Sequence, residues 1–250
     1  DLRMREILSD SKILQNHQAC NRVQDPYSFR CIPQVHGPVQ ETLSRLIGTV
    51  AIELNSSTDN PLIFPDPENP GPHEVVSQGN FHAEVLGLVS DAMSLSLFEL
   101  SAISERRIDQ MLDPNRRAIR PFLAENPGLE SGLMIVQYAA AASLGELHGH
   151  SSPRSAFSTT TSAGQEDHVS MAAAASWNLL ESIQRCSEVI ACEAFVAFRA
   201  LKIIATPSST CVQAFVRCMN NIVDGGMNDR STSDEIIAIA RELTSSTWLS

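Results

Sequence analysis

The spacing of apolar positions predicts a chain built from long helices. Beyond residue 38, one helix face is defined by apolar residues at the i, i+3, i+4, i+7 spacing: Leu43, Leu46, Ile47, Val50 and Leu54. Residues 83–112 contain no proline and a single glycine, and they are apolar on most sides, which is typical of a helix buried by several neighbours. Residues 171–206 contain neither glycine nor proline, and at 1.5 Å per residue this helix would be roughly 50 Å long.

The rest of the pattern adds shorter helices with loops between them. We expect a short helix at 2–8, a helical region at 128–149, and C-terminal helices at 208–223 and 233–243. Five prolines between residues 60 and 72 predict an exposed loop, and the Ser- and Thr-rich residues 151–164 predict another. Ser162, followed three residues later by Gln165, fits a capping box that would open the next helix. Signals for strands are almost absent.

These elements define an all-α fold, a bundle of long helices. We expect one helical domain over residues 1–250 in three parts: an active-site loop region at 1–38, a central bundle at 39–206 and C-terminal helices at 207–250. Helices this long and apolar usually pack into something larger than one bundle of this size. The chain is therefore expected to be part of a larger helical assembly.

Composition narrows the range of partners. With 43% hydrophobic residues, the 250-residue chain can bury a large core. Its formal net charge is −11 and no run of Lys and Arg stands out, so nucleic acid and anionic membranes are poor partners. No uninterrupted apolar run reaches the length of a membrane span. The six cysteines form no C-x-x-C pair, which favours a reduced, cytoplasmic protein.

The first candidate site lies in residues 23–37, where polar, aromatic and charged side chains surround two prolines. This mixture is not typical of a helix or a strand. Pro26 fixes one backbone angle and restricts Asp25, so a stiff backbone can hold Tyr27 and Arg30 in place. Arg offers a planar fork suited to a carboxylate, and Tyr can give or take a proton. A structural loop in which Arg30 pairs with a nearby acid remains the alternative.

A second cluster, Ser77 to His82, precedes the helix at 83–112. Gly79 permits a tight backbone there, and Asn80 is a candidate N-cap, with Phe81 projecting at the same helix start. Polar groups and the helix dipole at such a position can orient a ligand. Simple capping of the helix remains the alternative.

A third cluster, residues 162–170, brings two acids, a Gln and a His to the start of the longest helix. Acids are favourable at a helix N-terminus in any case. His82 and His168 with Glu166 and Asp167 contain the ligand types of a metal site, but their spacing matches no known metal signature, and we expect no metal.

Two further features of the helices are interpreted as structural. The Ser-Glu-Arg-Arg run at 104–107 lies in the middle of a helix and predicts ion pairing within the helix or between helices. Cys211 and Cys218 lie on one face of a predicted helix and are expected in the core.

Six segments together resemble the family of aromatic amino acid ammonia-lyases and aminomutases, in particular its histidine ammonia-lyases. They are QDPYSFRCIPQVHG (24–37), NSSTDNPLIF (55–64), GNFHAE (79–84), ISERR (103–107), GLESGLMIVQYAAAA (128–142) and QEDHVSM (165–171). They come in the family's order and at about its spacing. The chain resembles the C-terminal half of a protein about twice its length, in agreement with its start at Asp1 rather than at Met.

The resemblance implies an all-helical tetramer that eliminates ammonia from an aromatic amino acid, here L-histidine to give urocanate. In that family the amine is activated by an electrophilic methylidene-imidazolone ring, which forms from an internal Ala-Ser-Gly. This chain contains no Ala-Ser-Gly. The resemblance therefore places the ring and one catalytic Tyr on an N-terminal half, the chain's expected partner.

The resemblance also implies roles for individual residues. Arg30 would bind the substrate carboxylate, and Tyr27 and Glu166 would be the catalytic residues of this chain. The other residues expected to bind substrate are Gln24, Asn80, Phe81 and Gln165.

Two other interpretations remain open. A phenylalanine or tyrosine lyase or aminomutase of the same family is the first. QEDHVSM favours the histidine branch, because the plant phenylalanine branch carries Gln where Glu166 stands. The second is a non-catalytic helical module that only binds a partner, since the chain lacks Ala-Ser-Gly.

Overall fold

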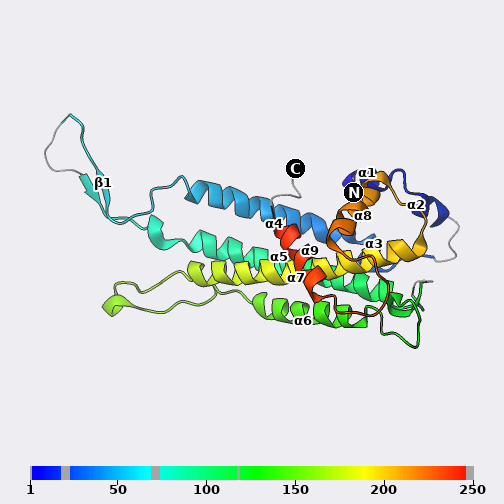
Figure 1. Cartoon of the computed structure of the whole chain (residues 1–250). Helices are drawn as coiled ribbons and strands as arrows, with labels where there is room; N and C mark the ends of the chain where they lie inside the picture. Colours follow the sequence, from blue (N-terminus) through cyan, green and yellow to red (C-terminus); the bar gives the residue numbers. More distant parts are fainter. Residues whose placement is uncertain (1, 18–22, 69–73, 117–118, 246–250) are drawn as a thin grey trace.

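The structure, a computed structural model, describes residues 2–17, 23–68, 74–116 and 119–245. Its centre is a bundle of long helices that lie side by side (Figure 1): α4 (Ile32–Glu53), α5 (Glu84–Leu112), α6 (Met134–His150) and α7 (Ala172–Ile204). α5 packs against α4, α6 and α7. This arrangement confirms the predicted all-α fold, including the two longest helices.

α5 and α7 supply much of the core. Their almost completely buried apolar side chains include Ile108, Leu112, Val189, Phe195 and Val196. By length and composition the helix over residues 80–112 would also be able to span a membrane. The sequence did not predict this, because the helix contains no uninterrupted apolar run of that length. We interpret it as the central helix of the bundle, because α4, α6 and α7 all pack against it.

Buried polar groups of α5 are paired across the bundle. Arg107 forms an ion pair with Glu193 of α7, with Nη2 and Oε2 2.7 Å apart, which confirms the ion pairing predicted for this part of the helix. The buried carboxylate of Asp91 accepts hydrogen bonds from the backbone N–H groups of Arg154 (3.0 Å) and Ser155 (2.7 Å). These contacts fix α5 against α7 and against the loop that follows α6.

The first candidate-site stretch is largely helical, contrary to the prediction. α3 (Tyr27–Arg30) is a single turn, and α4 begins at Ile32 rather than near Val39. Pro33 occupies the first turn of α4, where its missing N–H is not needed. Pro38 lies inside the helix without ending it. The rigidity expected of this stretch therefore comes from helix and proline together.

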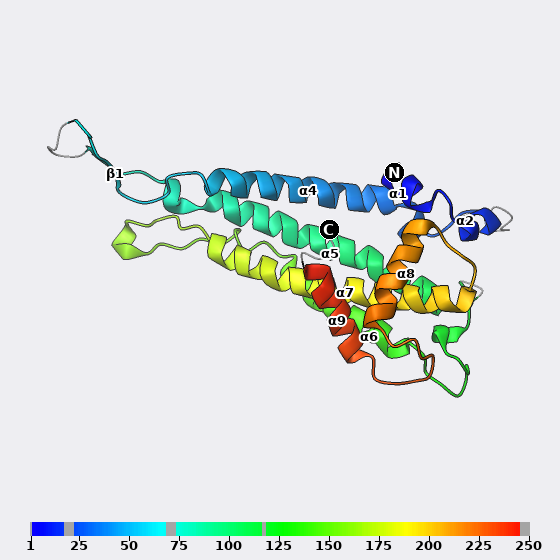
Figure 2. The same cartoon turned by 45° about the horizontal axis from the view of Figure 1, so that its top comes forward.

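Three shorter helices gather at one end of the bundle (Figure 2): α1 (Leu2–Leu8), α2 (Lys12–His17) and α8 (Thr210–Ile222). The fourth, α9 (Ser233–Thr244), packs against α7 nearer the middle of the bundle. α1 confirms the short helix predicted at 2–8, whereas α2 and the early start of α4 were not predicted for the loop region. Cys211 and Cys218 of α8 are exposed, so the prediction that they lie in the core is wrong. α8 buries Met219 instead. All cysteines in the described part of the chain are free thiols, and Cys20 lies outside it.

A short hairpin extends from the opposite end of the bundle (Figure 1). β1 (Leu62–Phe64) pairs antiparallel with β2 (Glu74–Val76), and Ile63 lies opposite Val75. The prolines had predicted a loop only. Strands this short contain too few positions for a recognisable alternating pattern.

Two predicted helix starts were wrong. Asn80 lies in a separate short turn, η1 (Asn80–His82), and α5 begins only at Glu84. Ser162 lies in the short turn η3 (Ser162–Gly164), well before α7. Neither residue caps a long helix, so both are available for other contacts.

α6 begins later than predicted because of a tight turn in front of it. Gly132 has a φ of +58°, a backbone conformation that favours glycine. Its N–H donates to Asp229 Oδ1 (2.9 Å), and the N–H of Ser131 donates to the other oxygen, Oδ2 (2.7 Å). One carboxylate from the segment between α8 and α9 thus holds the approach to α6.

Candidate functional site

The first group of predicted site residues lies near the C-terminal end of α5. Gln24, Tyr27 and Arg30 line an open hollow together with Gln110 and Arg116. The guanidinium carbon of Arg30 lies 4.3 Å from the ring centroid of Tyr27. A guanidinium stacked on a ring keeps the N–H groups along its edge available for a carboxylate. Tyr27 is 69% exposed and can therefore meet a ligand or another chain.

The second group lies where the turns before α5 and α7 meet. The remaining predicted residues lie on these two segments, Asn80 and Phe81 on the turn before α5 and Gln165 and Glu166 on the segment before α7. The two turns are joined through His82, whose Nε2 lies 3.0 Å from the carbonyl oxygen of His168. Phe81 is 54% exposed, and its ring is not part of the core.

Glu166 is the exposed carboxylate of this second group. The hydroxyl of Thr161 donates a hydrogen bond to it, and the backbone N–H of Thr161 donates to the Glu166 carbonyl oxygen at 2.9 Å. Hydrogen bonds from Thr161 and then Ser162 lower the pKa of Glu166 below its ordinary value. The carboxylate is therefore ionised at neutral pH and can accept a hydrogen bond or a proton.

The two groups lie at opposite ends of α5. Gln110, near the C-terminal end of this helix, lines the first group's hollow, and Asn80 lies just before its start. α5 contains 29 residues, which corresponds to about 40 Å at 1.5 Å per residue. Within one copy of the chain, the predicted residues cannot all contact one amino acid. The structure brings them together as two groups rather than one site.

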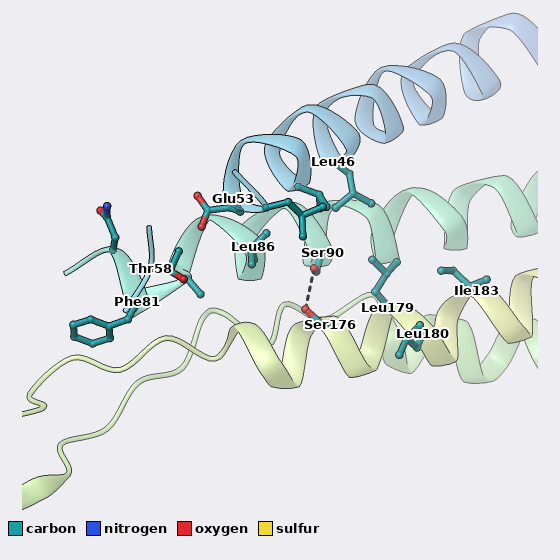
Figure 3. A pocket seen from close by; sticks show the side chains of 14 residues that line it. Leu46, Glu53, Thr58, Phe81, Leu86, Ser90, Ser176, Leu179, Leu180 and Ile183 are labelled. Carbon is teal, nitrogen blue, oxygen red and sulfur yellow. Dashed lines mark hydrogen bonds between the residues drawn. The ribbon is translucent and has the colours of Figure 1, made fainter. Parts of the chain in front are cut away.

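An apolar groove lies beside the second group (Figure 3). α4, α5 and α7 line it with Leu46, Val50, Leu54, Phe81, Leu86, Leu179, Leu180 and Ile183. Glu53, Thr58 and Asn80 add polar atoms to its lining. One wall is the apolar face of α4 that the spacing of residues predicts. The sequence does not show that α7 forms another wall, because the two helices are far apart along the chain.

The same junction groups three side chains of the types that bind metal ions. The ligand atoms of His82, Glu84 and His168 lie within 4.8 Å of one another. Sequence reasoning considered the two histidines together with Glu166 and Asp167. It missed Glu84, because only the folded chain shows which carboxylate lies beside the histidine pair.

Comparison with known proteins identifies the family to which this helical bundle belongs. Residues 2–221 match a family model described as aromatic amino acid lyase. The chain therefore belongs to the aromatic amino acid lyase family, and the family resemblance inferred from the motifs is confirmed.

Individual relatives place the chain near the histidine branch. It is 44% identical over 198 residues to histidine ammonia-lyase from Stigmatella aurantiaca, covering 79% of this chain and 38% of that protein. A crystal structure of histidine ammonia-lyase from Trypanosoma cruzi has a TM-score of 0.83 at 34% identity and covers 96% of this chain and 44% of that chain. The Pantoea agglomerans phenylalanine aminomutase has a TM-score of 0.85 at 30% identity, covering 97% of this chain and 50% of that chain. The chain thus spans half or less of the length of these relatives.

Proposed function

We propose that this chain is part of a cytoplasmic, histidine ammonia-lyase-like enzyme that converts L-histidine to urocanate and ammonia. The observation that carries the proposal is the exposed Glu166 carboxylate, which lies on the segment that His168 links to the turn of Phe81. Histidine presents ring N–H donors that a carboxylate accepts. A phenyl ring offers no such donor to the carboxylate. The similarity to curated histidine ammonia-lyases supports the same substrate.

The reaction breaks a C–H bond and a C–N bond of the amino acid. The β-proton is not acidic, and the amine is a poor leaving group. An electrophilic methylidene-imidazolone ring supplies the activation of the amine in this proposal. These 250 residues contain no Ala-Ser-Gly from which such a ring forms. We therefore assign the ring to another part of the enzyme.

The residues of this chain would bind the substrate and move protons. Arg30 can hold the carboxylate of the amino acid with two parallel N–H···O bonds, which fixes the orientation of the reacting carbons. Tyr27 and Glu166 are the groups that can hold or accept a proton. Phe81 offers an exposed ring for packing against the substrate.

The complete site would combine several copies of the chain. The two groups are about 40 Å apart in one copy, which is too far for one substrate. Exposed apolar side chains on α4, α5 and α7 supply surface for such packing: Leu43, Ile47, Leu95, Trp177 and Leu180. We therefore propose a tetrameric assembly with the remainder of the enzyme, in which one copy supplies the Arg30 group and another the Glu166 group.

Co-assembly of two inactive variants tests this arrangement. Complete enzyme carrying Arg30→Ala and complete enzyme carrying Glu166→Gln are purified separately and then refolded together. If the groups come from different copies, some sites in the mixture contain neither substitution, and activity returns. Failure to recover any activity in demonstrated mixed assemblies would contradict the composite site.

The substrate is tested by turnover of L-histidine, L-phenylalanine and L-tyrosine by the complete enzyme. Urocanate formation should exceed deamination of the other two amino acids. The 250-residue chain alone should not deaminate any of them, because it cannot form the electrophile. Robust deamination by the chain, with no other polypeptide present, would overturn the assignment of the ring to another part.

A phenylalanine or tyrosine lyase or aminomutase is the second candidate. The similarity to the Pantoea agglomerans phenylalanine aminomutase supports it. Formation of a β-amino acid from phenylalanine would favour this candidate over the first. If the complete, assembled protein turns over none of the three amino acids, a non-catalytic module would be favoured.

A further inference from the structure

Three side chains with metal-binding chemistry converge where the turns before α5 and α7 meet. The ligand atoms of His82, Glu84 and His168 lie within 4.8 Å of one another, with the first two residues partly buried. The two histidine rings stack with their centroids 5.5 Å apart and their planes 18° apart. The histidines are 86 residues apart in the chain. The fold, and not closeness in sequence, therefore holds this group together.

The observed separations are close to those around a zinc-type ion. With bonds of about 2.0–2.2 Å to nitrogen and oxygen, neighbouring ligand atoms of a tetrahedral site lie about 3.4 Å apart. His82 Nδ1 lies 3.9 Å from Glu84 Oε2. The excess is about 0.5 Å, which a rotation of the Glu84 carboxylate closes. His168 adds a ring nitrogen, and a water molecule can take the fourth position.

His82 Nε2 has two neighbours on His168, the backbone carbonyl oxygen and the ring nitrogen Nδ1, the latter 3.4 Å away. The carbonyl oxygen is the nearer at 3.0 Å, and it can only accept a hydrogen bond. When Nε2 of the neutral ring donates to this oxygen, Nδ1 presents a lone pair. A backbone carbonyl that fixes the tautomer in this way is a usual outer partner of metal-binding histidines.

His82 Nδ1 lies near a second group that can only accept a hydrogen bond, the Glu84 carboxylate. Glu84 Oε2 is too far away at 3.9 Å for a hydrogen bond, so no shared proton links the two atoms. A cation between His82 Nδ1 and the Glu84 carboxylate would stabilise these two electron-pair donors. The competing explanation is a weak ion pair between Glu84 and a protonated His82.

We propose that His82, Glu84 and His168 form a binding site for a divalent transition-metal ion of the zinc type. Imidazole suits zinc, copper, nickel and cobalt, and one carboxylate completes a ligand set that hard ions such as magnesium do not favour. The ion ties the turn that carries Phe81 to the segment that carries Glu166, and thereby fixes their relative position. Metal binding at this site does not depend on which amino acid the enzyme uses.

Metal titration of the complete protein tests the site. Protein stripped with EDTA is titrated with Zn²⁺ by calorimetry and with Co²⁺ by visible absorption, which reports tetrahedral nitrogen and oxygen ligands. We expect one ion per chain. His168→Ala should weaken binding by more than about 100-fold, because losing a ligand costs more than losing one of its outer partners. Glu84→Gln provides an independent variant with a smaller change in shape.

The matched control is His148→Gln, a substitution of an exposed histidine on α6. It should bind the ion as tightly as the unsubstituted protein. Equal unfolding temperatures of the metal-free proteins show that each variant is folded. Three results would overturn the proposal: no ion is bound, both ligand variants bind as tightly as the unsubstituted protein, or a sulfur-to-cobalt charge-transfer band shows that cysteines hold the ion.

Discussion

At the scale of single residues, the stacked pair of Tyr27 and Arg30 gives a direct prediction. Arg30→Lys keeps the charge but loses the planar fork and the stack on the Tyr27 ring. A hydrogen bond to a charged group contributes about 1.5–3 kcal/mol, so kcat/KM of the complete enzyme should fall on the order of 10–150-fold. Steady-state kinetics measure the change, with Arg45→Lys on the exposed side of α4 as the control. Unchanged kinetics would give Arg30 a structural role.

Glu166→Gln tests the proposed substrate at the same scale. The substitution removes the charge with almost no change in size, so histidine turnover should fall by roughly 100-fold or more if a general acid–base role is lost. Phenylalanine turnover should fall less, since its ring offers no partner to the carboxylate. Asp167→Asn, the same change at the neighbouring exposed residue, is the control. Unchanged histidine turnover in the Glu166→Gln variant would contradict the proposal that histidine is the substrate.

Residue types in short stiff segments predicted both groups of candidate site residues, but not their local conformation. Asn80 and Ser162 have the composition of helix caps. Ala83 and Ser162, however, adopt positive φ values of +61° and +50°, which interrupt the backbone before the long helices begin. A cap depends on the backbone angles around it, and those angles are set here by contacts between distant segments. Such contacts cannot be read from one stretch of sequence.

At the scale of elements, the turn before α6 depends on Gly132. A side chain there would place Cβ 2.5 Å from the carbonyl oxygen of Phe122, at a φ that only glycine adopts easily. Gly132→Ala should therefore lower the free energy of unfolding by more than about 1 kcal/mol. Gly145→Ala in α6, where Cβ meets nothing within 4 Å, should instead stabilise the helix by about 0.5–1 kcal/mol. Denaturant unfolding compares the two, and equal effects would contradict the role of the turn.

The packing of α4 against α5 makes stability depend on pH through His36. Burial, and then the charge of Arg107, lowers the pKa of His36 below its ordinary value of 6.5, and Glu193 opposes this shift. The unfolded chain therefore takes up this proton at a higher pH than the folded chain. Stability that is fully present above pH 6.5 is lost as the pH falls from there through the folded pKa.

His36→Gln should make the unfolding temperature less sensitive to this acidification. Thermal unfolding across the mildly acidic range measures the slope, and the exposed His148→Gln serves as the control. Parallel curves for His36→Gln and the unsubstituted protein would show that another group is responsible.

α5 and α7 were predictable because they contain no proline and at most one glycine over a long apolar stretch. The start of α4 was not, since Pro33 and Pro38 suggest a break, although the first turn of a helix accepts proline without losing a hydrogen bond. The hairpin of β1 and β2 was missed because each strand has only three residues. The residue types near a helix end therefore determine where the helix begins less than the contacts of the whole helix do.

At the scale of the whole molecule, exposed apolar helix faces predict association. Ile47, Trp177 and Leu180 are 60%, 68% and 57% exposed. Apolar surface of this kind marks interfaces. In sedimentation experiments the native protein should therefore be larger than a 27.2 kDa monomer. Ile47→Asp should shift it towards smaller species, whereas Leu2→Asp on exposed α1 should not. A compact monomer as the main species would contradict the prediction.

The family could be inferred from the motifs, but the separation of the predicted site residues into two groups could not. Tyr27 and Glu166 belong to one set of motifs, and nothing in their order along the chain shows that α5 holds them far apart. The separation becomes visible only when α5 is seen as a straight central helix with one group at each end (Figure 1). In the sequence of a single chain, contacts between copies are indicated only by apolar residues on exposed helix faces.

Because α5 lies between the two groups, its length sets the distance between them. Insertion of one helical turn would move one group relative to the other by about 5.4 Å and rotate it only slightly. Every copy in a symmetric assembly would carry the same error, so each composite site would be misaligned at once. Insertions and deletions during evolution should therefore be tolerated in the hairpin of β1 and β2 and excluded from α5. The most strictly preserved property of this helix would then be its number of residues rather than their identity.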